Sequence, residues 1–447
     1  MAGVTSKGGI AIVSLIIVGT LYSTVWAEPE ISVRDRKAAE VAITEKSDSA
    51  SDEYVTHRTA LAGEPLHLVF MGRSIDVPAM DRSSVNAITL GGAFYTPKQG
   101  ETSATPIGAL FINRVREEYR TRNVISGFVN DLEYDRSLGN IELVARLENN
   151  NILGGQREVV NNREIKSSDA VWGTVIASVG PGLRYKVAPF QTDNDLRLQL
   201  LGKVGYFYAD RTDDTGPNLV LPPSTMLYGA KLRGRYDGMR RNLMELPHTG
   251  MAAGFDLDYM YRAKWADFGT IPEAVFTKEE TRDYLQFNGY LMGVSGIPGL
   301  SEKNKLFLKI HGGVTNHKSA DRYNAITIGG GPLPGETGDL SRADYPGTMF
   351  NQVLVSNYAM LALEYRRELA PFIYLHLRET FIWADRAAVT ETNQFLFKSS
   401  TGAATTIGLD TGFFWDSALY LGYSWDSGFI RNGKSGSGLI LTWSKAF

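Results

Sequence analysis

The chain has 447 residues, of which 43% are hydrophobic and 21% charged, a balance typical of a folded protein. A net charge of -3 without a polybasic run argues against nucleic-acid binding, and the absence of cysteine excludes disulfides, cysteine nucleophiles and thiolate metal sites. A mean hydropathy of -0.16 argues against a bundle of membrane helices. It is compatible with a membrane barrel, where lipid-facing residues alternate with polar ones.

The N-terminus has the features of an export signal. An apolar run, Ile10–Leu21, follows the single charge of Lys7, and it is too short to cross a bilayer of roughly 30 Å as a helix. Val25 and Ala27 stand where a signal peptidase requires small residues. We therefore predict a signal peptide over residues 1–27, with an uncleaved anchor as the alternative.

Residues 28–82 differ in kind from the rest of the chain. Ser32–Arg58 is rich in charge and serine and poor in aromatic residues, which is typical of a flexible segment. We predict a short, partly disordered periplasmic segment with an amphipathic helix around Arg36–Ile43. It either plugs a barrel from below or hangs free.

Residues 83–447 show a two-residue rhythm. In Leu196–Tyr208 apolar side chains such as Leu198 and Leu200 alternate with polar ones such as Arg197 and Lys203. A period of two indicates a β-strand, because successive side chains point to opposite faces. The same contrast recurs to the end of the chain.

The strands and their connections indicate a membrane barrel. Many strands run for ten residues or more, and tight turns at 370–371 and 415–416 contrast with long polar connections at 149–168, 212–225 and 329–351. We predict an all-β fold, a transmembrane antiparallel barrel of about sixteen strands in the outer membrane of a Gram-negative bacterium. The count is open by two because residues 106–148 are hard to divide.

The last strand carries an assembly signal. Trp443 and Phe447 share its apolar face, and Phe447 ends the chain. Such a strand is what a barrel-assembly machinery can recognise by strand addition. We therefore expect that machinery and the lipids of the outer membrane as partners.

The sequence contains no motif that supports an enzymatic activity. Gly428–Ser435 fits the phosphate-loop pattern, but that motif requires a following helix, and here the flanks are two amphipathic strands. A lipase or acyltransferase would need a nucleophile beside a histidine, which the sequence does not assemble, and His311 is interpreted as a satisfied polar residue of the lumen. We predict no enzyme, no cofactor, no metal and no nucleotide.

The last third of the chain, 324–447, resembles the barrel of bacterial surface antigen proteins, the superfamily of the BamA and TamA insertases and of the two-partner secretion transporters. Gly329, Gly330 and Gly331 match the opening of that family's long loop before the twelfth strand, and Arg342 and Tyr345 match its Arg-Gly-Tyr motif. The resemblance implies sixteen strands and a loop that folds back into the lumen.

The resemblance also implies a lock for this loop. Glu364 and the pair Trp383 and Asp385 match lumen residues of the following two strands, where carboxylates satisfy the loop arginine. Ala343 stands where the family has glycine, and the added Asp344 could pair with Arg342 locally. The alternative is that these charged side chains are ordinary lumen residues near water and do not hold the loop.

The implied function is translocation or assembly of outer-membrane protein or lipid. The segment before the barrel is too short for the periplasmic POTRA modules of the superfamily, so the chain resembles a minimal form, with a periplasmic or lipoprotein partner in their place. The alternative function is a passive, porin-like channel with a constriction loop.

Overall fold

A computed structural model gives the fold. It describes residues 66–77, 84–98, 102–127, 129–151, 156–160, 163–187, 194–239, 247–270, 274–316, 318–329, 340–348, 353–370, 372–389, 395–411, 417–431 and 433–447. The predicted signal peptide, the predicted helix around Arg36–Ile43, and Gly330 and Gly331 lie outside these residues.

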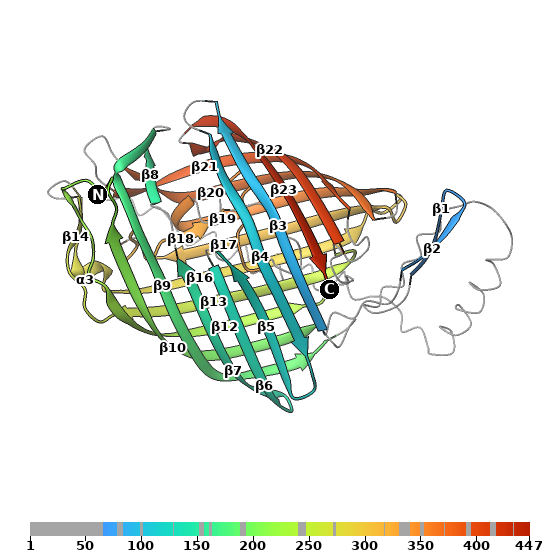
Figure 1. The fold of residues 1–447 in the computed structure, drawn as a ribbon, viewed down its shortest axis with the longest axis horizontal. Helices are drawn as coiled ribbons and strands as arrows, with labels where there is room; N and C mark the ends of the chain where they lie inside the picture. The colour runs from blue at the N-terminus through green and yellow to red at the C-terminus, as the bar shows by residue number, and fades with distance from the viewer. Residues whose placement is uncertain are drawn as a thin grey trace, which may run out of the picture. The chain divides into compact units, whose positions relative to one another are not determined.

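Long antiparallel strands close into a barrel (Figure 1). β17 pairs directly with β19 and β7 with β9, so the short strands β8 (Gln156–Val160) and β18 (Ile326–Ile328) are additions to a wall of sixteen. The predicted fold class is confirmed. The strands of the wall are β3 (Ser84–Pro97), β4 (Ser103–Val115), β5 (Tyr119–Ser126), β6 (Val129–Leu138), β7 (Ile141–Asn151), β9 (Arg163–Lys186), β10 (Asp195–Arg211), β12 (Thr225–Asp237), β13 (Gly250–Arg262), β16 (Asp283–Gly296), β17 (Asn304–Thr315), β19 (Val353–Ala370), β20 (Ile373–Val389), β21 (Phe395–Asp410), β22 (Ser417–Arg431) and β23 (Lys434–Ala446).

The barrel buries its polar face and exposes its apolar one. On β10, Leu198 and Leu200 are 43% and 56% exposed, whereas Arg197 and Gln199 between them are 9% and 1% exposed. A soluble protein does the reverse, because water makes apolar exposure unfavourable. This inversion, in a closed ring that leaves no strand edge unpaired, is suited to lipid outside and a polar lumen inside. The protein is an outer-membrane barrel.

The first and last strands seal the ring. β23 pairs with β3 in unbroken register from Gly436 opposite Pro97 to Ala446 opposite Ala87. The amide of Phe447 extends the ladder by donating to the carbonyl oxygen of Asn86 at 2.8 Å. The rim where Ser84 and Ala446 lie is called the terminal rim below.

The connections differ between the rims. At the terminal rim β4 joins β5 through residues 116–118, and β6 joins β7 through 139–140. These short turns resolve the region 106–148 that the sequence left undivided. The longest connections, 212–224, 263–282 and 316–352, leave the opposite rim, as is typical of extracellular loops, and the terminal rim is therefore assigned to the periplasmic side.

Two predicted long loops contain regular structure. Residues 149–168 are largely strand, because β8 pairs with an extension of β9. The connection 212–225 contains β11 (Leu219–Val220), which forms a small sheet with β14 (Phe268–Thr270) and β15 (Ala274–Phe276), followed by the helix α3 (Lys278–Thr281). Strand pairing satisfies the backbone N–H and C=O groups of these polar segments, which their composition did not indicate.

A separate hairpin lies within the predicted N-terminal segment. β1 (Leu66–Phe70) pairs with β2 (Arg73–Val77). Met71 and Gly72 at its turn have φ of +52° and +70°, the left-handed values that a two-residue hairpin turn of this type requires.

Charged side chains line the lumen over β5 to β13. Arg146 Nε lies 2.7 Å from Asp131 Oδ1, and Lys203 Nζ lies 2.6 Å from Asp258 Oδ2. Arg233 pairs with Glu133, which also accepts from Arg197. Opposite charges that reach across the lumen face, some of them from strands that are not adjacent in the ring, therefore neutralise each other, as they must where water is scarce.

Candidate functional site

The connection between β17 and β19, residues 316–352, is the candidate functional site and is called the lumen loop. β17 and β19 are the eleventh and twelfth strands of the wall, and the family resemblance implied a long inserted loop between these two strands. Its described parts are buried against residues of several wall strands. Two groups of contacts hold these described parts, one in each half of the loop.

The first half of the lumen loop is anchored beside β9, β10 and β13. Arg262 Nη1 on β13 lies 2.6 Å from Asp321 Oδ2, and neither side chain is more than 3% exposed. Asp321 Oδ1 accepts the backbone amides of Tyr323 and Asn324 at 2.7 and 3.0 Å. A single carboxylate thus fixes both the turn and its distance from the wall.

Aromatic packing strengthens this first anchor. The ring of Tyr323 lies 5.3 Å from Phe207, 5.6 Å from Trp172 and 5.5 Å from Phe268, measured between centroids. Offset and edge contacts of this kind stabilise beyond the area they bury. The anchor joins the loop to β9, β10 and the small β11–β14–β15 sheet.

The second half is held by Asp344. Its Oδ2 lies 2.9 Å from Arg378 Nη1 on β20, and its other oxygen pairs with Lys309 on β17. Burial by itself would raise the pKa of Asp344, but the charges of Arg378 and Lys309 outweigh it and hold the pKa well below its usual range. The loop therefore carries a stable anion between two fixed cations.

Tyr345 forms the adjacent contact. Its hydroxyl donates to Asp426 Oδ1 on β22 at 3.0 Å, and its side chain is fully buried. Burial, with the nearby Asp426 carboxylate, raises the pKa of Tyr345, so the phenol remains a donor. Asp426 also accepts the amides of Gly428, Phe429 and Ile430 at a bulge in β22.

The bulge in β22 is held from its carbonyl side as well. Arg386 on β20 donates to the carbonyl oxygens of Phe429 and Ile430. Asp426 and Arg386 together therefore fix a local backbone shape that the ladder alone would not maintain. The site that receives Tyr345 is thus built from residues of the wall.

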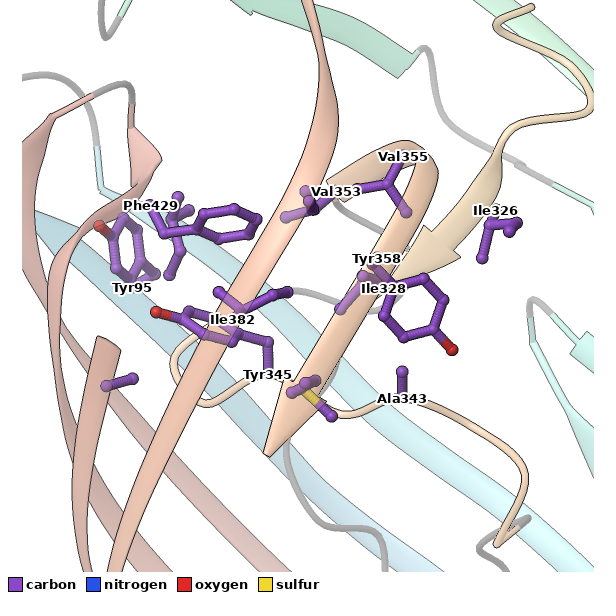
Figure 2. Packing of buried hydrophobic residues seen from close by; sticks show 14 residues of the cluster. Tyr95, Ile326, Ile328, Ala343, Tyr345, Val353, Val355, Tyr358, Ile382 and Phe429 are labelled. Atoms are coloured by element: carbon purple, nitrogen blue, oxygen red, sulfur yellow. The ribbon is translucent and has the colours of Figure 1, made fainter. Parts of the chain in front are cut away.

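Tyr345 and Phe429 also belong to a cluster of buried apolar residues (Figure 2). The ring of Tyr345 lies 5.1 Å from that of Phe429, with Tyr95 and Ile382 in the same cluster. Its members are Tyr95, Ile326, Ile328, Ala343, Tyr345, Val353, Val355, Tyr358, Met360, Ile382, Ala384, Ala404, Phe429 and Ile430. It excludes water from the hydrogen bond between loop and wall, which makes that bond stronger.

Backbone contacts complete the second anchor. A Cβ on Gly438 of β23 would lie 2.5 Å from the Cα of Gly347, so the loop and the last strand approach through two glycines. Arg342 Nη2 donates to the carbonyl oxygen of Gly329 at 2.7 Å, which joins the two described ends of the loop. Gly329 has φ of +139°, a backbone conformation that favours glycine.

The predicted lock residues are only partly brought together. Glu364 is buried and accepts from His376 Nδ1 at 2.8 Å and from Arg366. The sequence suggested a local ion pair between Asp344 and Arg342. In the structure Asp344 instead pairs with Lys309 and Arg378.

Trp383 and Asp385 require a correction. They alternate with buried Ile382, Ala384 and Arg386, and Trp383 is 42% exposed. The indole of Trp383 donates to Ser399, and Asp385 accepts from Asn357 at 2.9 Å. Because successive side chains of a strand point to opposite faces, both residues lie on the outer face.

Sequence reasoning missed Lys309, Arg378 and Asp426. A signal for Arg378 was present, since it alternates with Leu375, Leu377 and Phe381, which mark the lipid side of β20. No comparable signal identified Asp426, because its role depends on a bulge and on a loop 81 residues away.

Chemically, the arrangement positions the loop. Among the residues that the structure describes, no group of His, Asp or Glu side chains is placed to hold a metal ion. Gly428–Ser435 lies across β22 and β23, as the amphipathic flanks predicted, and the described part of the segment is followed by strand. Within the described ranges, no helix is long and apolar enough to cross a bilayer.

No protein-family model matches the chain, and no curated protein matches it in sequence. Among solved structures it is similar to CdiB from Acinetobacter baumannii, with 10% identity over 84% of this chain and 63% of that one and a TM-score of 0.46. For BamA from Haemophilus ducreyi lacking POTRA domains 1–3 the identity is 12%, the coverage 92% and 79%, and the TM-score 0.47. A FadL homologue from Pseudomonas aeruginosa has 9% identity, coverage of 82% and 90%, and a TM-score of 0.34. The chain thus spans less than two thirds of the length of CdiB.

Proposed function

We propose that this barrel acts in the translocation or assembly of protein or lipid at the outer membrane, as a surface-antigen-type barrel whose lumen loop is a plug. The observation that carries the proposal is the two-point attachment of the loop. One anchor, Asp321 with Arg262, lies at β13, and the other, Tyr345 with Asp426, lies at β22.

The two anchors lie far apart around the ring. β13 is the ninth and β22 the fifteenth of the sixteen wall strands, so the loop passes from one side of the barrel towards another. Buried ion pairs and a buried phenol hold it there. A segment held at both ends restricts the free passage of solutes that a porin needs, and its release would be a controlled event.

The proposal includes a partner. In the resembling superfamily the periplasmic modules before the barrel collect the substrate, and a separate periplasmic protein or lipoprotein would do so here. The alternative function, a passive channel with a constriction loop, shares the same fold and differs in conductance.

Conductance in planar bilayers is the test. We expect wild-type barrels to be closed for most of the recording, and Tyr345→Phe to increase the open fraction because it removes the hydroxyl that binds Asp426. The matched control is Tyr259→Phe, which removes a hydroxyl from the exposed outer wall. A large, steady conductance in the wild type would establish the passive channel and overturn the proposal.

A second measurement concerns transport itself. Cells that lack the protein should contain less of one or more outer-membrane proteins or lipids, and the wild-type gene should restore them. Arg262→Gln together with Asp321→Asn should fail to restore them although the barrel is inserted. Unchanged outer-membrane composition in the deletion strain would contradict the proposed activity.

A further inference from the structure

The outer wall of the barrel contains a hollow of about 850 Å³. It lies over β5, β6, β7, β9, β10 and β12, which are adjacent strands of the wall (Figure 1). Most of its lining residues point outward, including Tyr134, Val179 and Tyr228, which are 41%, 58% and 48% exposed. The hollow therefore opens towards lipid and is separate from the lumen loop.

Small side chains create the hollow. Two rows of directly paired residues cross the strands, and the first passes from Tyr134 through Ala145 and Val179 to Gly202. In the second row Leu147 is followed by Ala177. The small side chains at Ala145, Ala177 and Gly202 form a floor between larger neighbours.

One end of the hollow is polar. Thr121 and Asn123 on β5 line it, and Asn123 pairs with Ile112 on one side and Leu132 on the other. Neither Thr121 nor Asn123 has a side-chain hydrogen bond in the part of the chain that the structure describes. Placing a side-chain amide in hydrocarbon without a hydrogen-bond partner costs several kcal/mol of free energy. A lipid-facing Asn123 therefore requires a polar group from outside the protein.

The polar end lies near the membrane surface and the apolar end lies deeper. Thr121 and Asn123 are the third and fifth residues of β5 from the terminal rim. Val204 and Tyr228, at the other end of the second row, are each the tenth residue from that rim on β10 and β12. The hollow therefore runs obliquely from the interface into the bilayer.

The rings of Tyr119 and Tyr134 mark the interface beside the polar end. They stack on the outer wall with centroids 6.1 Å apart. Tyrosine prefers the depth where ester and headgroup atoms meet the acyl chains. A hydrogen-bond acceptor at this depth followed by a hydrocarbon chain is the chemistry of a glycerophospholipid.

We propose that this hollow is a binding site for one phospholipid of the periplasmic half of the bilayer. An acyl chain lies over Ala145, Ala177 and Gly202, and the ester or headgroup oxygens accept from Asn123 and Thr121. The site goes beyond the proposed transport function and does not depend on it, because it lies on the outer wall and not in the lumen.

The test is a lipid-binding measurement. Palmitoyl-oleoyl phosphatidylethanolamine is added to the delipidated protein in detergent, and native mass spectrometry counts the lipids bound. Gly202→Leu fills the hollow, and the backbone accepts a side chain there because a Cβ would meet only the carbonyl oxygen of Val179, at 3.7 Å. We expect it to weaken binding of the first lipid about tenfold, and Asn123→Leu to do the same by removing the donor.

Gly293→Leu is the matched control, since Gly293 on β16 is a wall glycine whose Cβ would have no atom within 4 Å. It should bind as the wild type does. Equal binding in wild type, Gly202→Leu and Asn123→Leu would overturn the site. Folding of each variant is checked by heat-modified migration on gels, and Asn123→Leu keeps the test decisive if Gly202→Leu does not fold.

A photo-reactive amino acid in place of Val179 identifies the occupant in cells. An adduct with the mass of a phospholipid supports the proposal. An adduct with another protein chain, or none, would overturn it in favour of a protein interface or an empty wall.

Discussion

The hydroxyl of Tyr345 donates to Asp426 Oδ1 at 3.0 Å, joining a loop that leaves β17 to a bulge in β22. The hydroxyl is the one polar group that Tyr345→Phe removes, and the ring contact with Phe429 stays. We expect docking of the second half of the loop to weaken by about 1–3 kcal/mol, because Asp426 loses a buried partner.

The absence of cysteine makes this weakening measurable. Ala343 is 3% exposed, so Ala343→Cys introduces a single thiol that a maleimide reaches only when the loop undocks. Labelling should be faster in Tyr345→Phe than in its parent. Asp426→Asn added to Tyr345→Phe should change the rate by less than the sum of the single effects, since the two residues share one contact. Strictly additive effects would show that they act separately.

The contact of Asp344 with Arg378 and Lys309 predicts a dependence on pH. The pKa of Asp344 is lower in the docked loop than in a free aspartate, whose value is about 3.9. The stabilisation is therefore fully present above that ordinary value and is lost as the pH falls below it towards the docked pKa. Tryptic or thiol probes are unsuitable in acid, so pepsin cleavage of the loop at descending pH is the measurement.

A variant distinguishes the contribution of Asp344 to this pH dependence from that of other carboxyl groups. Asp344→Asn should undock the loop at neutral pH, at a cost of about 3–5 kcal/mol, because two buried cations lose their anion. Its loop should then be cleaved by pepsin with a weaker dependence on pH than in the wild type. An unchanged pH profile in Asp344→Asn would assign the transition to other carboxyl groups.

Gly438→Ala should displace the loop without changing a charge. The added methyl group would lie 2.5 Å from the Cα of Gly347, and backbone cannot give way as a flexible side chain does. We expect a penalty of about 1–3 kcal/mol on docking and faster labelling of Ala343→Cys. Gly108→Ala is the control, since a Cβ there would meet nothing within 4 Å. Equal labelling rates in the two variants would mean that the loop does not press on β23.

Phe447→Ala should reduce insertion more than stability. The side chain of Phe447 is 72% exposed, so its loss removes little packing, while the hydrogen bond from its backbone amide to the carbonyl oxygen of Asn86 remains. If the terminal aromatic is read during assembly, cells should contain several-fold less folded barrel, with an unchanged unfolding temperature of the purified protein. The same loss with a lowered unfolding temperature would point to stability, and Trp443→Ala, on the same outer face, provides the comparison.

The sequence by itself determined the barrel. Alternation over many strands gives the sheet one apolar and one polar face. In lipid every backbone amide needs a partner, so the sheet must close into a barrel. The loop between the eleventh and twelfth strands was also placed correctly, through the resemblance carried by Gly329 and the Arg342–Tyr345 motif.

The partners of the loop were decided by tertiary structure. Which charges meet depends on strand register and on a bulge at Asp426, and a one-residue difference moves a side chain to the other face. Trp383 and Asp385, which were matched by motif, lie on the outer wall because they continue the alternation of Leu377 and Phe381 along β20, a signal that the sequence did contain. The meeting of Asp344 with Arg378 and Lys309, in contrast, joins β17, β20 and the loop. Local pattern fixes which residues face inward in a regular strand, but only the closed ring brings β17, β20 and β22 to one loop.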